Sequence, residues 1–271
     1  MRQTLTVLGL LTTAIAVVSV AAGEPRTQRH ALKDAVSATT RTPTNVARDK
    51  YRHPLETLSF FGVKPGDTVV EIWPGGGWYT EILGPLTAGK GTLYAAAPWP
   101  NGVKGAQTLQ AKDAAAYGHL KFAAFPWVEG QPKVPDGTAD VVLTFRNVHN
   151  WRMGYQRDGQ DYAPDAFAQM FRMLKPGGVL GIEDHRLPES ASDEREKSSG
   201  YIKVSTVRRL AEAAGFEFVA ASEVNANPKD TADWKDGVWT LPPSYRLKDV
   251  DRAKYEAIGE SDRMTLKFRK P

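Results

Sequence analysis

The sequence predicts an α/β protein whose mostly parallel sheet carries helices on both faces. Short runs rich in β-branched residues recur along the chain, and each is continuously apolar, as is typical of a strand buried on both sides. Segments with helical periodicity lie between them, and this alternation is typical of a doubly wound sheet. The seven expected strands are residues 68–72, 92–97, 121–125, 139–145, 179–183, 216–223 and 263–269.

Two helices and the last strand have the clearest patterns. Residues 164–174 carry apolar side chains at helical spacing, and two glycines at 177–178 stop the pattern. A second helix is expected over residues 205–214, with Ser205 as its N-cap. Residues 263–269 alternate between polar and apolar side chains, which predicts an antiparallel last strand.

The first residues predict export from the cytoplasm. Arg2 is followed by an uncharged apolar stretch that ends in small residues before Gly23, and this is typical of a secretory signal peptide over residues 1–22. A retained membrane anchor is the alternative. No later stretch is long and apolar enough to cross a bilayer, so we expect a periplasmic or secreted protein without stable membrane insertion after cleavage. A polar linker with an N-terminal helix is expected over residues 23–50.

The composition excludes several kinds of site. The chain has 271 residues, with 35 Lys and Arg, 31 Asp and Glu, and no cysteine. A disulfide framework, a thiol nucleophile, an iron–sulfur cluster and a Cys-ligated zinc are therefore excluded. The charges are balanced and form no long basic run, so we expect a small-molecule substrate and no nucleic-acid partner, with the oligomeric state left open.

A glycine-rich turn, Trp73-Pro74-Gly75-Gly76-Gly77, follows the first expected strand. Glycines let the backbone turn tightly and approach a ligand, and in an open sheet ligands bind beyond the carboxyl ends of the strands. Trp73 stands at the first glycine of the dinucleotide-binding fingerprint, and the Lys-Ser/Thr pair of a phosphate loop is missing. A tight turn without a ligand is the alternative.

Several spaced motifs resemble one known family. Residues 62–72, 139–143 and 174–180 and the glycine turn follow the order found in class I S-adenosylmethionine-dependent methyltransferases. The segments that are similar to an exported bacterial subgroup of this superfamily are residues 51–54, 71–81 (EIWPGGGWYTE), 225–230 and 259–264. The resemblance implies a Rossmann-like, methyltransferase-like domain over residues 51–271, with S-adenosyl-L-methionine as the cofactor.

The resemblance also assigns cofactor contacts. It implies that the amino-acid end of the cofactor lies against the glycine turn, with Glu71 contributing its carboxylate. The family's acid after the second strand, which binds the ribose, is replaced here by Ala97-Pro98-Trp99, and a polar residue after the third strand is replaced by Phe125-Pro126-Trp127. The expected cofactor-binding residues are Glu71, Trp73, Pro74, Gly75, Gly76, Gly77, Tyr79, Trp99 and Trp127.

Four of the seven tryptophans fall at the carboxyl ends of the first four strands: Trp73, Trp99, Trp127 and Trp151. These ends meet at one edge of the sheet, which predicts an aromatic pocket able to stack on a planar ring or to hold a sulfonium by cation–π attraction. Packing against the strand ends is the alternative.

The expected catalytic residues are Asn147 and His149 after the fourth strand and His185 after the fifth. Histidine is the side chain whose ordinary pKa lets it accept a proton near neutrality, and the methyl acceptor must lose one. A structural histidine bonded to a neighbouring loop is the alternative for His149. The sequence around His185, Glu183-Asp184-His185-Arg186, has metal-binding side chains, but no spacing elsewhere completes a ligand set, so no metal is expected.

Two further segments are candidates for contacts with the substrate. Arg52 and His53 form part of a possible lid that faces an anionic substrate, although Pro54 alone explains a helix boundary there. The polar insertion over residues 225–245 contains tryptophans and prolines that we expect to pack over something.

These observations predict methyl transfer from S-adenosyl-L-methionine to a small or medium acceptor. The alternative is a non-catalytic protein of the same fold that binds another ligand in an aromatic pocket.

Overall fold

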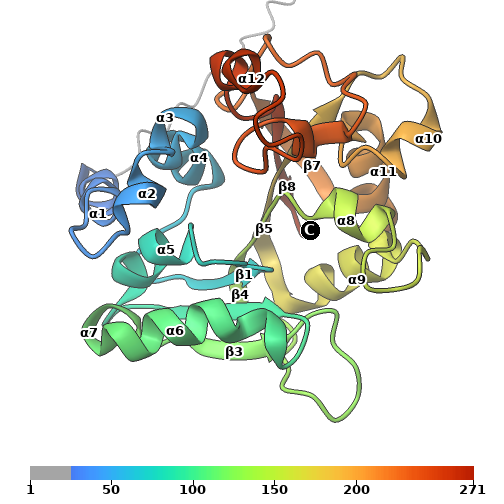
Figure 1. Cartoon of the computed structure of the whole chain (residues 1–271). Coiled ribbons are helices and arrows are strands. Elements are labelled where there is room, and N and C mark those ends of the chain that lie inside the picture. Colours follow the sequence, from blue (N-terminus) through green and yellow to red (C-terminus); the bar gives the residue numbers. More distant parts are fainter. Residues whose placement is uncertain (1–25) are drawn as a thin grey trace, which may run out of the picture.

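The computed structural model describes residues 26–271, and the predicted signal peptide lies outside them. The sheet has the order β3-β2-β1-β4-β5-β8-β7, with the short β6 paired to the end of β5 (Figure 1). The strands are β1 (Thr68–Ile72), β2 (Thr92–Ala97), β3 (Lys121–Ala124), β4 (Ala139–Phe145), β5 (Leu174–Leu187), β6 (Ile202–Lys203), β7 (Glu217–Ser222) and β8 (Arg263–Arg269). The predicted α/β fold is confirmed.

The order of the strands places a ligand edge at the centre of the sheet. β1 pairs in parallel with both β2 and β4, so that Val69 lies opposite Leu93 on one side and Val141 on the other. The chain winds outward from β1 through β2 to β3 and then returns to β4 on the other side of β1. The carboxyl ends of β1 and β4 therefore flank the point where the winding reverses, which is where ligands bind in such sheets. β8 is antiparallel to β5 and β7, as predicted.

Helices cover both faces of the sheet because β1 alternates its side chains between two cores. Val70 packs in one core with Trp151 and Phe167, and Val69 packs in the other with Leu58. The helices of the Val70 face include α8 (Val148–Arg152), α9 (Ala163–Met173) and α11 (Val204–Ala213). Those of the Val69 face include α1 (Arg26–Val36), α4 (Pro54–Phe61), α5 (Thr80–Thr87), α6 (Lys104–Lys112) and α7 (Ala114–Tyr117).

Short helices complete the fold. They are α2 (Pro43–Val46), α3 (Asp49–Arg52), η1 (Asn101–Val103), α10 (Asp193–Glu196), η2 (Gly237–Thr240) and α12 (Arg252–Ile258). Pro54 does separate two helices, because α3 ends at Arg52 and α4 begins at Pro54. No helix within residues 26–271 combines the length and the apolar character needed to cross a membrane.

Three local expectations differ from the structure. A polar linker with an N-terminal helix was expected over residues 23–50, but the described part forms α1, α2 and the start of α3, and Leu32 of α1 is buried in the core. The helix expected over residues 164–174 ends at Met173, and the two glycines that follow lie in β5, which begins at Leu174. Ser205 lies inside α11, whose N-cap is Lys203, and its hydroxyl bonds to Glu189 instead.

Candidate active site

The glycine turn after β1 forms one wall of a cavity of about 520 Å³. Trp73 has a φ of 52°, and its indole N–H donates to the carbonyl oxygen of Phe125 at 3.0 Å, which fixes the ring at the end of β1. Gly75 has a φ of 57°, and a Cβ placed there would meet no atom within 4 Å, so its backbone is open to a ligand. The lining residues are Trp73, Gly75, Ala97, Pro98, Trp99, Asn101, Gly102, Asn147, Tyr155 and Gln156.

Glu71 lies beneath this turn rather than in the cavity wall. Its side chain is buried, and Thr80 at the start of α5 donates a hydrogen bond to its carboxylate at 2.6 Å. Burial raises the pKa of Glu71 to about 7, although the Thr80 bond and the charge of Arg146 act the other way. The carboxylate therefore ties the turn to α5, and its direct contact with the cofactor stays a prediction.

The other residues expected at the turn are divided between cavity and core. Tyr79 stacks on Phe145 with ring centroids 3.5 Å apart, and its hydroxyl donates to Glu183 at 3.3 Å inside the protein. Pro74 is buried, and a Cβ on Gly77 would lie 2.6 Å from a methyl carbon of Leu109, so Gly77 allows α6 to pack closely. Gly76 is exposed beside the cavity.

The four strand-end tryptophans do not form one aromatic wall. Trp73 and Trp99 line the cavity, where Tyr155 joins them. Trp151 is fully buried in the core. Trp127 packs in its own loop, with its indole N–H donating to the carbonyl oxygen of Gln131 at 2.9 Å. Half of the set therefore faces the cavity and half serves packing.

The three expected catalytic residues lie at the carboxyl ends of β4 and β5. Asn147 lines the 520 Å³ cavity, and its amide donates to the carbonyl oxygen of Ile72 and to the hydroxyl of Thr144, each at 3.1 Å. His149 and His185 line a second cavity, of about 340 Å³. The structure therefore places these residues at one edge of the sheet.

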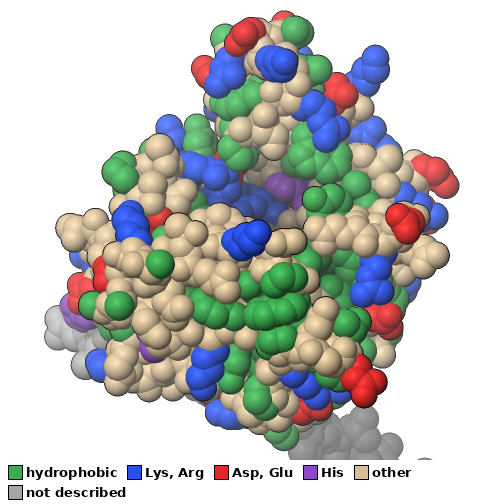
Figure 2. All heavy atoms as spheres, turned by 60° about the horizontal axis from the view of Figure 1, so that its bottom comes forward, with side chains coloured by type: hydrophobic (Ala, Val, Ile, Leu, Met, Phe, Trp, Pro, Cys, Tyr) green, Lys and Arg blue, Asp and Glu red, His purple; other side chains and the backbone are tan. Residues whose placement is uncertain are grey.

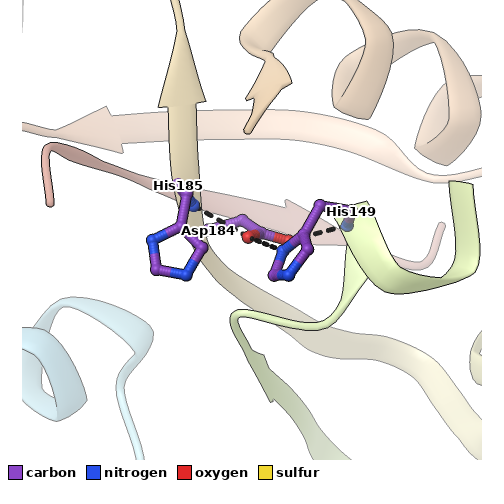
Figure 3. Close-up of side chains that lie close together, drawn as sticks. All are labelled: His149, Asp184 and His185. Carbon is purple, nitrogen blue, oxygen red and sulfur yellow. Dashed lines mark hydrogen bonds and ion pairs between the residues drawn. The ribbon is translucent and has the colours of Figure 1, made fainter. Parts of the chain in front are cut away.

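Asp184 lies between the two histidine rings (Figure 3). Its carboxylate is 2.7 Å from Nδ1 of His149 and accepts the backbone N–H groups of His149 and His185. A carboxylate beside Nδ1 favours the tautomer with the proton on that nitrogen, which leaves Nε2 of His149 as a proton acceptor at the cavity. Nδ1 of His185 lies 2.5 Å from the hydroxyl of Ser261. Burial, together with the charges of His149 and Arg146, lowers the pKa of His185 well below its ordinary value.

His149, Asp184 and His185 also form a possible metal-ligand set, because one donor atom from each lies within 4.8 Å of the others. The sequence could not show this, because His149 belongs to a different strand end. The carboxylate already accepts three N–H groups, and arginines line the same cavity, so the surroundings disfavour a cation. That no metal binds here stays a prediction.

Arginines dominate the second cavity, which we call the arginine cavity. Arg48, Arg52 and Arg146 line it together with one carboxylate, that of Glu260. Figure 2 shows basic side chains and a histidine gathered at the floor of a hollow. Arg52 was expected near a substrate, whereas His53 instead contacts Asn225, with Nδ1 and Oδ1 3.4 Å apart.

The sequence did not assign the other charged residues of this cavity to a site. Arg146 directly precedes Asn147, and its place at a strand end was the available signal for it. Glu260 lies in the 259–264 motif, which was given no role, and Arg48, just ahead of α3, had no local signal. Trp239, Pro242 and Pro243, from the insertion expected to pack over something, line the cavity.

A third hollow connects the two cavities. It shares Trp73 and Tyr155 with the 520 Å³ cavity and shares Asn150 and Trp239 with the arginine cavity. A ligand on the glycine turn and a ligand among the arginines would therefore approach each other beside α8.

Residues 70–182 match the family described as a methyltransferase domain. No curated protein matches the sequence. Among solved structures, a SAM-dependent methyltransferase from Aquifex aeolicus is 18% identical, with a TM-score of 0.55 over 90% of this chain and 98% of that one.

Two further solved structures share the fold of this chain. The [4+2]-cyclase SpnF is 16% identical, with a TM-score of 0.55 over 81% of this chain and 80% of that one. Phosphoethanolamine N-methyltransferase 2 of Haemonchus contortus, in complex with phosphomonomethylethanolamine and S-adenosylhomocysteine, is 16% identical, with a TM-score of 0.52 over 89% of this chain and 60% of that one. At these identities the likeness shows the fold.

The 520 Å³ cavity fits S-adenosylmethionine at three points. Gly75 offers an open backbone, and Trp73 and Trp99 offer aromatic faces for a planar ring or a sulfonium. Ala97-Pro98-Trp99 stands where the family has its ribose-binding acid. Asn101 is the next polar side chain along the sequence in the cavity wall, and its amide can bond to hydroxyl groups. The glycine turn and the two tryptophans line the same cavity, so both could contact a cofactor bound there.

Proposed function

We propose that this protein transfers a methyl group from S-adenosyl-L-methionine to a small acceptor. The domain match and the shared fold support a methyltransferase enzyme that uses this cofactor. The observation that carries the proposal is the cavity on the glycine turn at the winding reversal, which connects beside α8 with a cavity that contains a histidine–aspartate pair.

The chemistry needs positioning and a proton acceptor. When bound, S-adenosyl-L-methionine supplies a methyl carbon that bonds to a lone pair of the acceptor while the electrons of the S–C bond remain on sulfur. In this proposal His149 takes the acceptor's proton at Nε2, and Asp184 holds its ring by the 2.7 Å contact at Nδ1. Asn147, which two hydrogen bonds hold in the wall of the 520 Å³ cavity, orients the reacting groups.

We further propose that the reaction takes place in the periplasm or outside the cell, because the first 22 residues have the pattern of a signal peptide. Fractionation of cells that produce the tagged full chain, with the mass of the mature protein, tests this. An unprocessed chain in the cytoplasm would contradict it.

Non-catalytic ligand binding has one specific observation in its favour, the missing acid at the end of β2. The domain match instead favours an enzyme. The two functions are separated by whether the cofactor binds.

Calorimetric titration of the purified protein with S-adenosylmethionine and S-adenosylhomocysteine tests the proposal. Wild type should bind both. Gly75→Ala should lose about tenfold in affinity, because its methyl group would occupy the cavity wall. Gly89→Ala is a matched control, since Gly89 also has a positive φ, of 70°, and open space around it, but lies outside the cavity. Both variants should lose similar stability, roughly 1 kcal/mol. No heat and no thermal shift with wild type at millimolar ligand would refute cofactor use.

A further inference from the structure

We propose that the methyl acceptor carries an oxyanion, a carboxylate or a phosphoryl group, and that this group binds between the guanidinium groups of Arg52 and Arg146 in the arginine cavity. This inference rests on the proposed function, because it names the class of acceptor for that site.

Three arginines of the cavity have a buried nitrogen that makes no hydrogen bond within residues 26–271. These atoms are Nη2 of Arg48, Nη1 of Arg52 and Nη1 of Arg146. Buried polar groups in native proteins are nearly always paired, and arginine is the side chain best suited to bind a carboxylate or phosphate through two parallel hydrogen bonds. Three unpaired donors around one cavity therefore indicate a missing anionic partner.

The carboxylate in the cavity wall is already shared. Glu260 accepts from Nε of Arg48 at 2.7 Å, from Nε of Arg52 at 3.1 Å and from Nη1 of Arg263 at 3.1 Å. Arg146 makes no ion pair with any described residue. Glu183 pairs with Arg263 at 3.0 Å, and the attraction between Arg146 and Glu260 acts without an ion-pair contact. The cavity consequently keeps an excess of positive charge.

The burial and the pKa of Arg52 agree with an excess of positive charge in the cavity. Its side chain is only 3% exposed, and burial together with the charge of Arg146 lowers its pKa to about 9, despite Glu260. A buried cation is stabilised by an opposite charge within a few ångströms. An oxyanion between Arg52 and Arg146 would supply that charge.

The backbone at Arg146 supports a binding role. This residue has a φ of 61°, a left-handed conformation that costs free energy for any residue with a Cβ. Its N–H donates to the carbonyl oxygen of Glu183 at 2.7 Å, and its own carbonyl accepts from the amide of Asn150 at 3.3 Å. Strained backbone that neighbours hold in place is typical of functional sites.

The arginine cavity also limits the size and the chemistry of the rest of the acceptor. Its volume of about 340 Å³ is at the small end for ligand sites. Trp239, Pro242 and Pro243 form an apolar wall, while His149 lies on the wall shared with the arginines. Arg146 and Asn147 are consecutive and line different cavities. An acceptor whose anionic end binds Arg146 would therefore extend its nucleophilic atom past Asn147 toward the cofactor.

Thermal shift and calorimetry with defined probes test this inference at constant ionic strength and without cofactor. The probes are inorganic phosphate and benzoate, with benzamide as the uncharged analogue of benzoate. We expect one or both anions to raise the melting temperature with saturation and benzamide to have no comparable effect. The stronger anion identifies whether the acceptor carries a phosphoryl group or a carboxylate.

Arg146→Asn is the informative variant, because Asn tolerates a positive φ and the change removes a half-buried cation that makes no ion pair with a described residue. It should be as stable as wild type or more stable, and it should bind the anion at least about tenfold more weakly. Arg208→Gln on α11, an exposed residue outside the cavity, is the control and should bind as wild type does. The affinity for S-adenosylhomocysteine should be the same in all three proteins. If none of them binds it, the proposed function fails, whereas the anion titrations test the acceptor class alone. The inference is overturned if neither anion exceeds benzamide, or if Arg146→Asn keeps full anion affinity.

Discussion

Arg52 and Glu260 form a buried ion pair between residues 208 positions apart in the chain, with Nε 3.1 Å from Oε2. The pair joins α3 to the segment before β8, and both side chains are almost fully buried. The arginine cavity therefore exists only when the N-terminal helices are packed against the end of the sheet.

Replacing Glu260 with Gln should destabilise the protein strongly. The change removes the carboxylate shared by three arginines and leaves buried positive charge, which costs about 3 kcal/mol in unfolding free energy. Urea denaturation measures the loss. Glu217→Gln is the control, because Glu217 pairs with Arg269 at the surface and should change stability by less than about 1 kcal/mol. Equal losses in the two variants would contradict a central role for Glu260.

Glu260 should also shape the stability of the protein in acid. Burial raises the pKa of this carboxyl, but the charges of Arg52, Arg263 and Arg146 outweigh burial and hold it at about 2. The unfolded chain takes up the proton first, so the contribution is complete above the ordinary pKa of about 4.5 and is lost as the pH falls toward 2. It amounts to about 3 kcal/mol. The unfolding free energy of Glu260→Gln should fall less than that of wild type between pH 4.5 and pH 2. An equally large fall in both proteins would contradict the pairing of Glu260 with the arginines.

Glu71 should act in the opposite direction. Its pKa is raised to about 7 by burial, so the folded protein holds a proton that the unfolded chain releases near pH 4.5. The stabilisation is present below that pH and is lost as the pH rises through 7. Glu71→Gln, which can still accept the hydrogen bond of Thr80, should therefore flatten the decline in stability from pH 4.5 to 7. Chemical denaturation from pH 4.5 to 7 measures this decline in both proteins. A decline in Glu71→Gln as steep as in wild type would show that Glu71 stays ionised in the folded protein.

Trp99 and Trp127 should respond differently to truncation. Trp99→Ala removes a wall of the 520 Å³ cavity and should weaken binding of S-adenosylhomocysteine by about tenfold. Trp127→Ala should lower the melting temperature and leave affinity unchanged, because Trp127 bonds to Gln131 within its own loop. Calorimetry and thermal unfolding of the two variants distinguish these roles. A loss of affinity in Trp127→Ala would show that Trp127 also contributes to ligand binding.

The sequence determined the parts of this protein that depend on local pattern. Seven of the eight strands, the antiparallel β8, the glycine turn and the missing acid after β2 follow from side-chain period, glycine geometry and chain order, which neighbouring residues specify. The two-residue strand β6 was not predicted. The suggestion that Arg52 meets an anion also came from the chain near Pro54.

Which side chains contact one another depends on how distant segments pack. His149 and Asp184 are 35 positions apart in the chain. Glu260, near the C-terminus, accepts hydrogen bonds from Arg48 and Arg52, near the other end of the described chain. Trp99 and Trp127 both follow strands, yet one ring faces the cavity and the other its own loop. Such outcomes depend on the direction each side chain takes when helices pack on the sheet, and a pattern of neighbouring residues does not contain that direction.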